Sequence, residues 1–164
     1  MNPTHVTDDL QWLRRRVREL TDREEITDLV YRLSVALDEG RFEELKSIFT
    51  DDAVAQTPGG LAQGRDALIA QAARNHSSEE RIQHLIGNVL IDMDGDRADV
   101  RANLLATFAS PGTADAQDTA RLAPEPRLTL GEVYRFQAVR TPHGWRLSRV
   151  ETTPLWTTGR SRSA

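Results

Sequence analysis

The apolar positions in the first third of the chain recur at helical spacing. A first stripe predicts a helix over residues 10–20 and consists of Leu10, Leu13, Val17 and Leu20. The run Thr21-Asp22-Arg23-Glu24 matches a capping box, which predicts that a second helix begins there. The apolar stripe of this second helix consists of Ile26, Leu29, Val30, Leu33 and Leu37. Gly40 is a natural stop, and a short third helix is expected from Arg41 to Phe49.

After residue 50 the pattern changes toward alternation. We expect a short strand over Ala53–Thr57, a turn at Pro58-Gly59-Gly60 and a helix from Gly64 to Asn75. Four longer strands then follow, at 81–93, 98–110, 128–139 and 145–156. The first two are joined at Asp94-Gly95-Asp96, a hairpin signal. The segment 111–126 has few large apolar residues and is predicted to be a mobile loop, which is either a lid or a connection without a function.

This order of elements predicts an α+β fold in which helices cover one face of a curved antiparallel sheet. The chain of 164 residues fits one domain. We divide it into a helical extension at 1–20, the domain proper at 21–157 and a disordered tail at 158–164. Long strands that curl around helices leave a pocket where the sheet and the helices part.

Composition narrows the classes of function. The net charge is −4, so nothing points to nucleic acid, and we read Arg14-Arg15-Arg16 as a solvated helix face. The chain has no cysteine, which excludes disulfides and thiolate metal sites. The four histidines have no metal-ligand spacing, although a metal site assembled in space stays open. No apolar run reaches the roughly 20 residues of a membrane span, and we expect a cytoplasmic protein without a signal peptide.

Several short segments, in this order, resemble the SnoaL-like branch of the nuclear-transport-factor-2-like (NTF2-like) superfamily. They are Leu37-Asp38-Glu39-Gly40-Arg41-Phe42, Phe49-Thr50-Asp51-Asp52-Ala53-Val54, Gln83-His84-Leu85-Ile86-Gly87 and Gly144-Trp145-Arg146-Leu147. The resemblance covers roughly residues 20–157. It implies a cone in which N-terminal helices lie inside a curved antiparallel sheet around an internal pocket. The fold hosts many activities, so it does not by itself define the function.

The resemblance also implies two catalytic residues. Scytalone dehydratase has a histidine in a strand that reads like the one around His84. Hexachlorocyclohexane dehydrochlorinase has the same histidine and a helix aspartate that falls on Asp38. Both are cofactor-free eliminases in which the histidine is the base. This chain lacks the second histidine that scytalone dehydratase has in the return strand, here residues 97–110, so only the Asp38/His84 pair carries over.

The residues around this pair add candidate substrate contacts. With a two-residue hairpin turn, His84 shares its sheet face with Asn103 and Thr107, which we expect to bind substrate. Tyr31 lies in line with Asp38 on the helix, where it either polarises a carbonyl or packs. The arginines of the last two strands bind an anionic substrate or lie on the surface; they are Arg135, Arg146 and Arg149.

Two functions from different classes remain. The first is an enzyme without cofactor or metal, in which Asp38 orients His84 and His84 removes a proton from a small hydrophobic oxygenated substrate. Elimination, isomerisation and aldol cyclisation of a polyketide-like or terpenoid-like metabolite share that step. The second is a ligand-binding or assembly domain without chemistry. In either case we expect a homodimer that pairs through the outer sheet face, with apolar side chains there such as Val133, Val139 and Val150.

Overall fold

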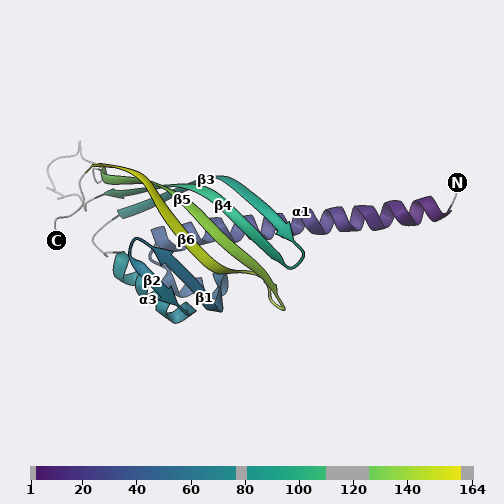
Figure 1. The fold of residues 1–164 in the computed structure, drawn as a ribbon, viewed down its shortest axis with the longest axis horizontal. Helices are drawn as coiled ribbons and strands as arrows, with labels where there is room; N and C mark the ends of the chain where they lie inside the picture. The colour runs from purple at the N-terminus through teal and green to yellow at the C-terminus, as the bar shows by residue number, and fades with distance from the viewer. Residues whose placement is uncertain (1–2, 77–80, 110–125, 160–164) are drawn as a thin grey trace, which may run out of the picture.

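A computed structural model of the chain describes residues 3–76, 81–109 and 126–159. Its elements are α1 (Pro3–Asp38), η1 (Phe42–Glu44), α2 (Leu45–Ile48), β1 (Phe49–Thr57), β2 (Gly60–Gln63), α3 (Arg65–Asn75), β3 (Arg81–Asp94), β4 (Arg97–Ala109), β5 (Pro126–Thr141) and β6 (Gly144–Gly159) (Figure 1). Most of the helical residues precede the strands, and α3 lies between β2 and β3, where the sequence predicts a helix from Gly64 to Asn75. The expected mobile loop at 111–126 lies outside the described residues, except that Pro126 begins β5.

The described strands form one sheet in the order β2-β1-β6-β5-β4-β3. Neighbouring strands are antiparallel except β1 and β6, which pair in parallel. The α+β class is confirmed, with the helices on the inner face of the curved sheet (Figure 1). The short strand β2 was not expected from the sequence. Strand β6 continues through Gly159, so the first residues of the expected disordered tail belong to the sheet.

The helix α1 is continuous over 36 residues, so the expected start of a second helix at Thr21 is wrong. The capping-box residue Asp22 lies inside the helix, and its carboxylate binds side chains of the sheet. The division of the chain at residue 20 stays a prediction. No described helix combines the length and the apolar character needed to cross a lipid bilayer, and the cytoplasmic location also stays a prediction.

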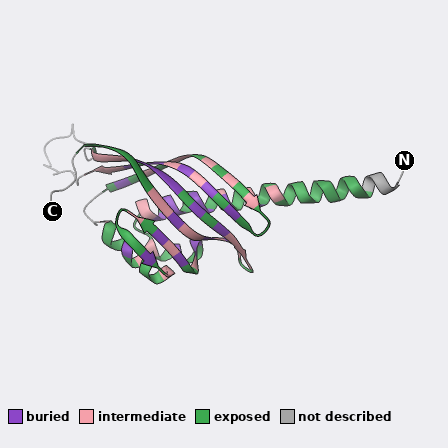
Figure 2. Ribbon diagram, in the orientation of Figure 1, coloured by how far each residue is buried: buried purple, intermediate pink, exposed green. Residues whose placement is uncertain are grey.

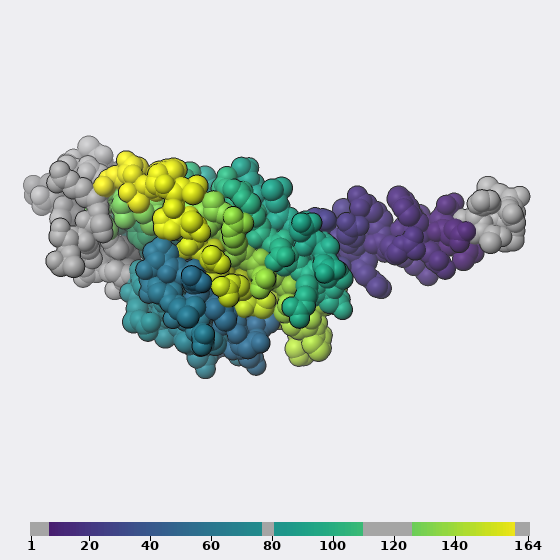
Figure 3. Space-filling view, in the orientation of Figure 1, coloured from purple at the N-terminus to yellow at the C-terminus, as the bar shows by residue number. Residues whose placement is uncertain are grey.

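The two halves of α1 have different surroundings. The first half stands out from the body as an arm (Figure 3), and its stripe of Leu10, Leu13, Val17 and Leu20 is exposed. The second half buries Ile26, Leu29, Val30 and Leu33 against the inner face of the sheet (Figure 2). The predicted stripe of the second half is therefore confirmed as part of the core, and burial of each such side chain contributes about 1.5–3 kcal/mol.

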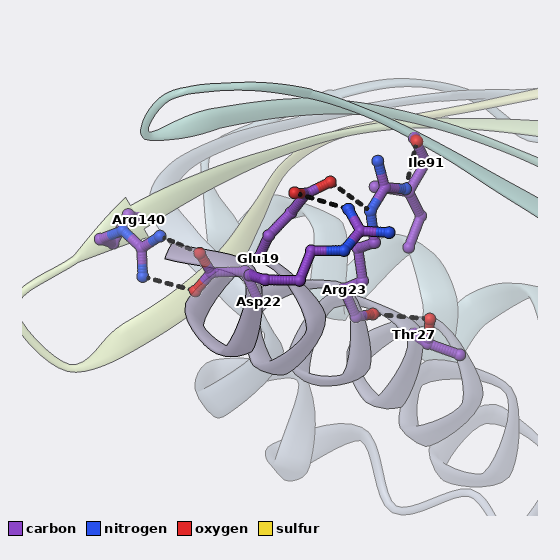
Figure 4. A network of polar contacts seen from close by, with 7 residues as sticks. Glu19, Asp22, Arg23, Thr27, Ile91 and Arg140 are labelled. Atoms are coloured by element: carbon purple, nitrogen blue, oxygen red, sulfur yellow. Dashed lines mark hydrogen bonds and ion pairs between the residues drawn. The ribbon is translucent and has the colours of Figure 1, made fainter. Parts of the chain in front are cut away.

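A partly buried ion pair connects the middle of α1 to the hairpin between β5 and β6. The carboxylate of Asp22 accepts hydrogen bonds at 2.8 and 2.6 Å from both terminal nitrogens of Arg140, and one at 3.0 Å from the Trp145 indole (Figure 4 draws the Asp22–Arg140 contact). The Arg140 guanidinium holds the pKa of Asp22 below its ordinary value. The guanidinium of Arg23, one residue further on, donates to the Ile91 carbonyl at 2.7 Å. These contacts fix how α1 crosses the sheet.

Candidate active site

The centre of the candidate site is a contact between the end of α1 and the start of β3. The Nδ1 atom of His84 lies 2.5 Å from Oδ1 of Asp38. The backbone N–H of His84 also donates to both oxygens of the same carboxylate, at 3.0 and 3.1 Å. Gly40, with φ of +67°, ends the helix just beyond Asp38. Asp38 and His84, the pair that the resemblance implies, are therefore in direct hydrogen-bond contact, and their catalytic roles stay a prediction.

This geometry fixes the tautomer of His84. A carboxylate accepts and does not donate, so Nδ1 carries the proton and Nε2 of a neutral imidazole keeps its lone pair. A carboxylate in the last turn of a helix opposes the helix dipole by roughly 0.3–1 kcal/mol. The backbone and imidazole N–H groups of His84 offset that cost. The side chain of His84 is only 7% exposed, so the hydrogen bond is shielded from water.

A bulge decides which face of the sheet carries His84. Near the hairpin Leu90 pairs with Arg101, but beyond the bulge Gly87 pairs with Asn103, so the register has changed by one residue. The extra residue falls at Asn88, whose φ is +52°. His84 consequently lies opposite Ala106 and faces the helices. The expectation that His84 shares a mixed polar face with Asn103 and Thr107 is wrong, because a shift of one residue exchanges the two faces.

His84 lines a cavity of about 220 Å³ between the inner face of the sheet and the helices. Most of the lining is apolar and comes from α1, α3 and the sheet, including Leu33, Leu68, Phe108 and Leu130. Asp38 is not among the lining residues, so it supports His84 from behind. The edge of the imidazole opposite Asp38, which carries Nε2, is the edge available to a molecule in the cavity.

Three further titratable side chains line this cavity. Burial lowers the pKa of His76 and raises the pKa values of Glu132 and Tyr134. Burial therefore favours the uncharged form of each. The ring centroid of His76 lies 6.2 Å from that of His84, and Nδ1 of His76 contacts the Ala72 carbonyl at 2.6 Å. Sequence reasoning missed all three, because their shared cavity depends on strand register and on where α3 ends.

The predicted substrate contacts lie elsewhere. Tyr31 is 45% exposed and does not line the cavity, whereas Tyr134 does. Asn103 and Thr107 face away from the helices, and the Thr107 hydroxyl lies 3.3 Å from that of Thr129. We therefore do not retain these three as substrate-binding residues. A Gly-Asn pair inside a strand, here Gly87-Asn88, is the sequence signal that favours a bulge.

No arginine or lysine is found among the described residues that line the cavity. Arg135, Arg146 and Arg149 lie outside it, and Arg146 donates instead to the Trp145 carbonyl. Within the described ranges, no three histidine or carboxylate side chains gather closely enough to hold a metal ion. The titratable groups among the described lining residues are therefore His76, His84, Glu132 and Tyr134.

The chain belongs to the SnoaL-like domain family, whose profile matches residues 18–151. The uncharacterised protein Rv2910c of Mycobacterium tuberculosis is 34% identical over 140 residues, covering 83% of this chain and 88% of that protein.

Three solved structures share the fold. An NTF2-like protein with a cystatin-like fold from Novosphingobium aromaticivorans has a TM-score of 0.72 and 27% identity, over 90% of this chain and 91% of that one. A candidate scytalone dehydratase from the same organism has a TM-score of 0.71 and 24% identity, over 89% and 92%. A type 2 hexachlorocyclohexane dehydrochlorinase, LinA, has a TM-score of 0.71 and 18% identity, over 90% and 95%. The NTF2-like fold expected from the sequence is confirmed.

Proposed function

We propose that this chain is a cofactor-independent enzyme that removes a proton from carbon next to a carbonyl group in a small, uncharged, largely apolar substrate. The observation that carries the proposal is the 2.5 Å contact between Asp38 and a cavity-lining His84. A fixed Nδ1–H tautomer leaves Nε2 as the base, and the carboxylate stabilises the imidazolium that forms. The similarity to structures described as a dehydratase and a dehydrochlorinase supports a lyase or isomerase of this kind.

Other cavity residues supply the remaining needs of such a reaction. Burial keeps the Tyr134 phenol protonated, so it can donate a hydrogen bond to the carbonyl oxygen as negative charge develops there. Burial lowers the pKa of His76, which makes it a weaker base than an exposed imidazole. The apolar lining favours a hydrophobic oxygenated metabolite, such as one of polyketide or terpenoid type.

The test is proton exchange in heavy water. A series of uncharged aryl ketones with a β-hydroxyl group, beginning with 4-hydroxy-4-phenylbutan-2-one, is incubated with the protein, and deuterium at the α-carbon is followed by NMR. We expect exchange that depends on protein concentration. Binding of these ketones without exchange would instead favour the second function, a ligand-binding domain without chemistry.

Replacing Asp38 with asparagine is expected to slow exchange by about 10²-fold or more. An amide oxygen can still accept the backbone N–H of His84, so the fold is retained. The amide NH₂, however, donates toward Nδ1 and moves the ring proton to Nε2, which removes the base. The measurement is the exchange rate together with the melting temperature. A variant that exchanges as fast as the natural chain would show that Asp38 does not set the tautomer.

We also propose a homodimer that pairs through the outer face of the sheet. A row of neighbouring residues runs across this face, from Leu85 through Leu105 and Gly131 to Trp156. Leu85 is 66% exposed and Trp156 is 49% exposed, and the indole lies directly over Gly131, where a Cβ would clash. Of the residues expected to be exposed in this interface, Val150 was assigned wrongly because it is buried in the core, and Val133 is also buried.

Leu105→Glu is expected to halve the mass measured by light scattering at micromolar concentration, because it puts a charge in the apolar row. Val17→Glu on the arm of α1 is the matched control, since Val17 is 60% exposed and lies outside the row. If Val17→Glu gives the monomer and Leu105→Glu does not, the arm and not the sheet holds the dimer.

A further inference from the structure

The carboxylate of Glu132 is the one acidic side chain among the described residues that line the cavity. The residue is only 7% exposed. Within the part of the chain that the structure describes, His84 and Tyr134 interact with this carboxyl group electrostatically, but no hydrogen bond or ion pair to it is formed. A structural carboxylate at such a depth is normally paired, because burying an unpaired charge is costly. An unpaired acid that lines a cavity is therefore a candidate for substrate binding or proton transfer.

The sheet register places Glu132 on the same inner face of the sheet as the base, two strands away from it. Glu132 pairs with Leu104, which pairs with Ile86, two residues along β3 from His84. Their strands, β5 and β3, are separated by two strand spacings, or about 10 Å. Both side chains line the same cavity, so a small molecule bound there can contact the imidazole and the carboxyl group together.

The environment of Glu132 favours the protonated carboxylic acid. Burial raises its pKa above the ordinary value of 4.5, although the nearby His84 opposes this in part. No lysine or arginine among the described lining residues stabilises the carboxylate form. A carboxylic acid in an apolar cavity is a proton donor, and Nε2 of His84 is a proton acceptor in the same cavity.

We propose that Glu132 is the general acid of an elimination, and that the substrates are uncharged β-hydroxy carbonyl compounds. This inference rests on the proposed proton abstraction by His84. The α-C–H bond breaks and its proton goes to Nε2 of His84. The electron pair forms the new C=C bond, and the C–O bond to the β-hydroxyl breaks. That oxygen takes the Glu132 proton and leaves as water, and return of the first proton through solvent to Glu132 restores both groups.

The experiment separates the two proton transfers with the same probe, 4-hydroxy-4-phenylbutan-2-one. Deuterium entry at the α-carbon reports on the base, and ultraviolet absorbance of the conjugated enone reports on loss of water. In Glu132→Gln we expect loss of water to fall by about 10²–10⁴-fold, while exchange falls by about tenfold or less. Glu43→Gln, whose side chain is 79% exposed, is the matched control and should match the natural chain in both.

The pH dependence provides a second readout that a purely structural residue would not change. Loss of water in the natural chain should decline as pH rises through the pKa of Glu132, because the acid must be protonated. Exchange should not decline there, because it needs neutral His84. The Glu132→Gln variant should lack that decline, and Glu132→Asp should restore part of it.

Each outcome of the probe experiment decides between the proposals. Equal falls in exchange and in loss of water would overturn the acid role, as would an unchanged rate of water loss in Glu132→Gln. A natural chain that exchanges but never releases water would also overturn it while leaving the base intact. Absence of exchange across the ketone series would contradict the proposed function itself, and the role of Glu132 with it.

Discussion

Replacing His84 with alanine is expected to lower the rate of α-proton exchange by about 10²–10⁴-fold, the usual contribution of a positioned general base. The change removes Nε2 and leaves a gap beside the aromatic ring of His76. It also removes the side-chain donor to Asp38 but keeps the backbone N–H that binds the same carboxylate. The fold should therefore survive, and circular dichroism should give the spectrum of the natural chain.

His143→Ala provides the control for this experiment, because His143 is an exposed histidine in the turn between β5 and β6. It should exchange at the natural rate. If His84→Ala and His143→Ala are equally active, the base lies elsewhere in the cavity, and His76 would be the next residue to replace.

The largest expected effect on stability comes from Asp22→Ala. This change leaves the Trp145 indole without its acceptor and removes the buried partner of Arg140. Breaking such a pair is expected to cost about 2–3 kcal/mol in the free energy of unfolding. For a chain of this size that corresponds to a melting temperature lower by about 5–10 °C, measured by calorimetry.

Asp96→Ala is the matched control, because Asp96 binds the same guanidinium at 2.8 Å but its side chain is 80% exposed. Its loss should cost at most about 1 kcal/mol. The folded-state pKa of Asp22 is below its ordinary value of 3.8, so its stabilising contribution is complete above that pH. That contribution should be lost as the pH falls through the lower folded-state value, and Asp22→Ala should abolish this part of the acid sensitivity. Equal melting temperatures for the two variants would contradict the account.

Local periodicity was enough to predict the α+β class and the core stripe of α1, since both depend on spacing within one segment. The break expected at Thr21 was wrong for a reason that lies far along the chain. Asp22 resembles part of a cap, but its partners Arg140 and Trp145 are more than 100 residues away in the sequence. Short capping patterns do not contain that information.

For a similar reason, the sequence indicated the Asp38/His84 pair but not the other residues of the candidate site. The resemblance to known eliminases indicated Asp38 and His84, and their contact is present. The substrate contacts depended on the strand register, and the single extra residue at Asn88 exchanged the two faces of the strand. Asn103 and Thr107 were therefore placed on the wrong face, while Glu132 and Tyr134 were overlooked. Strand register is set by tertiary packing and becomes visible only when the sheet is assembled.

The most direct test of the central claim is a crystal structure of the chain with 4-phenylbutan-2-one, which has the ketone and α-protons of the probe but no leaving group. We predict that the ketone occupies the cavity with its α-carbon about 3–3.5 Å from Nε2 of His84, a distance suited to proton transfer. A ketone bound outside this cavity, or bound within it with the α-carbon turned away from His84, would contradict the claim that His84 is the base.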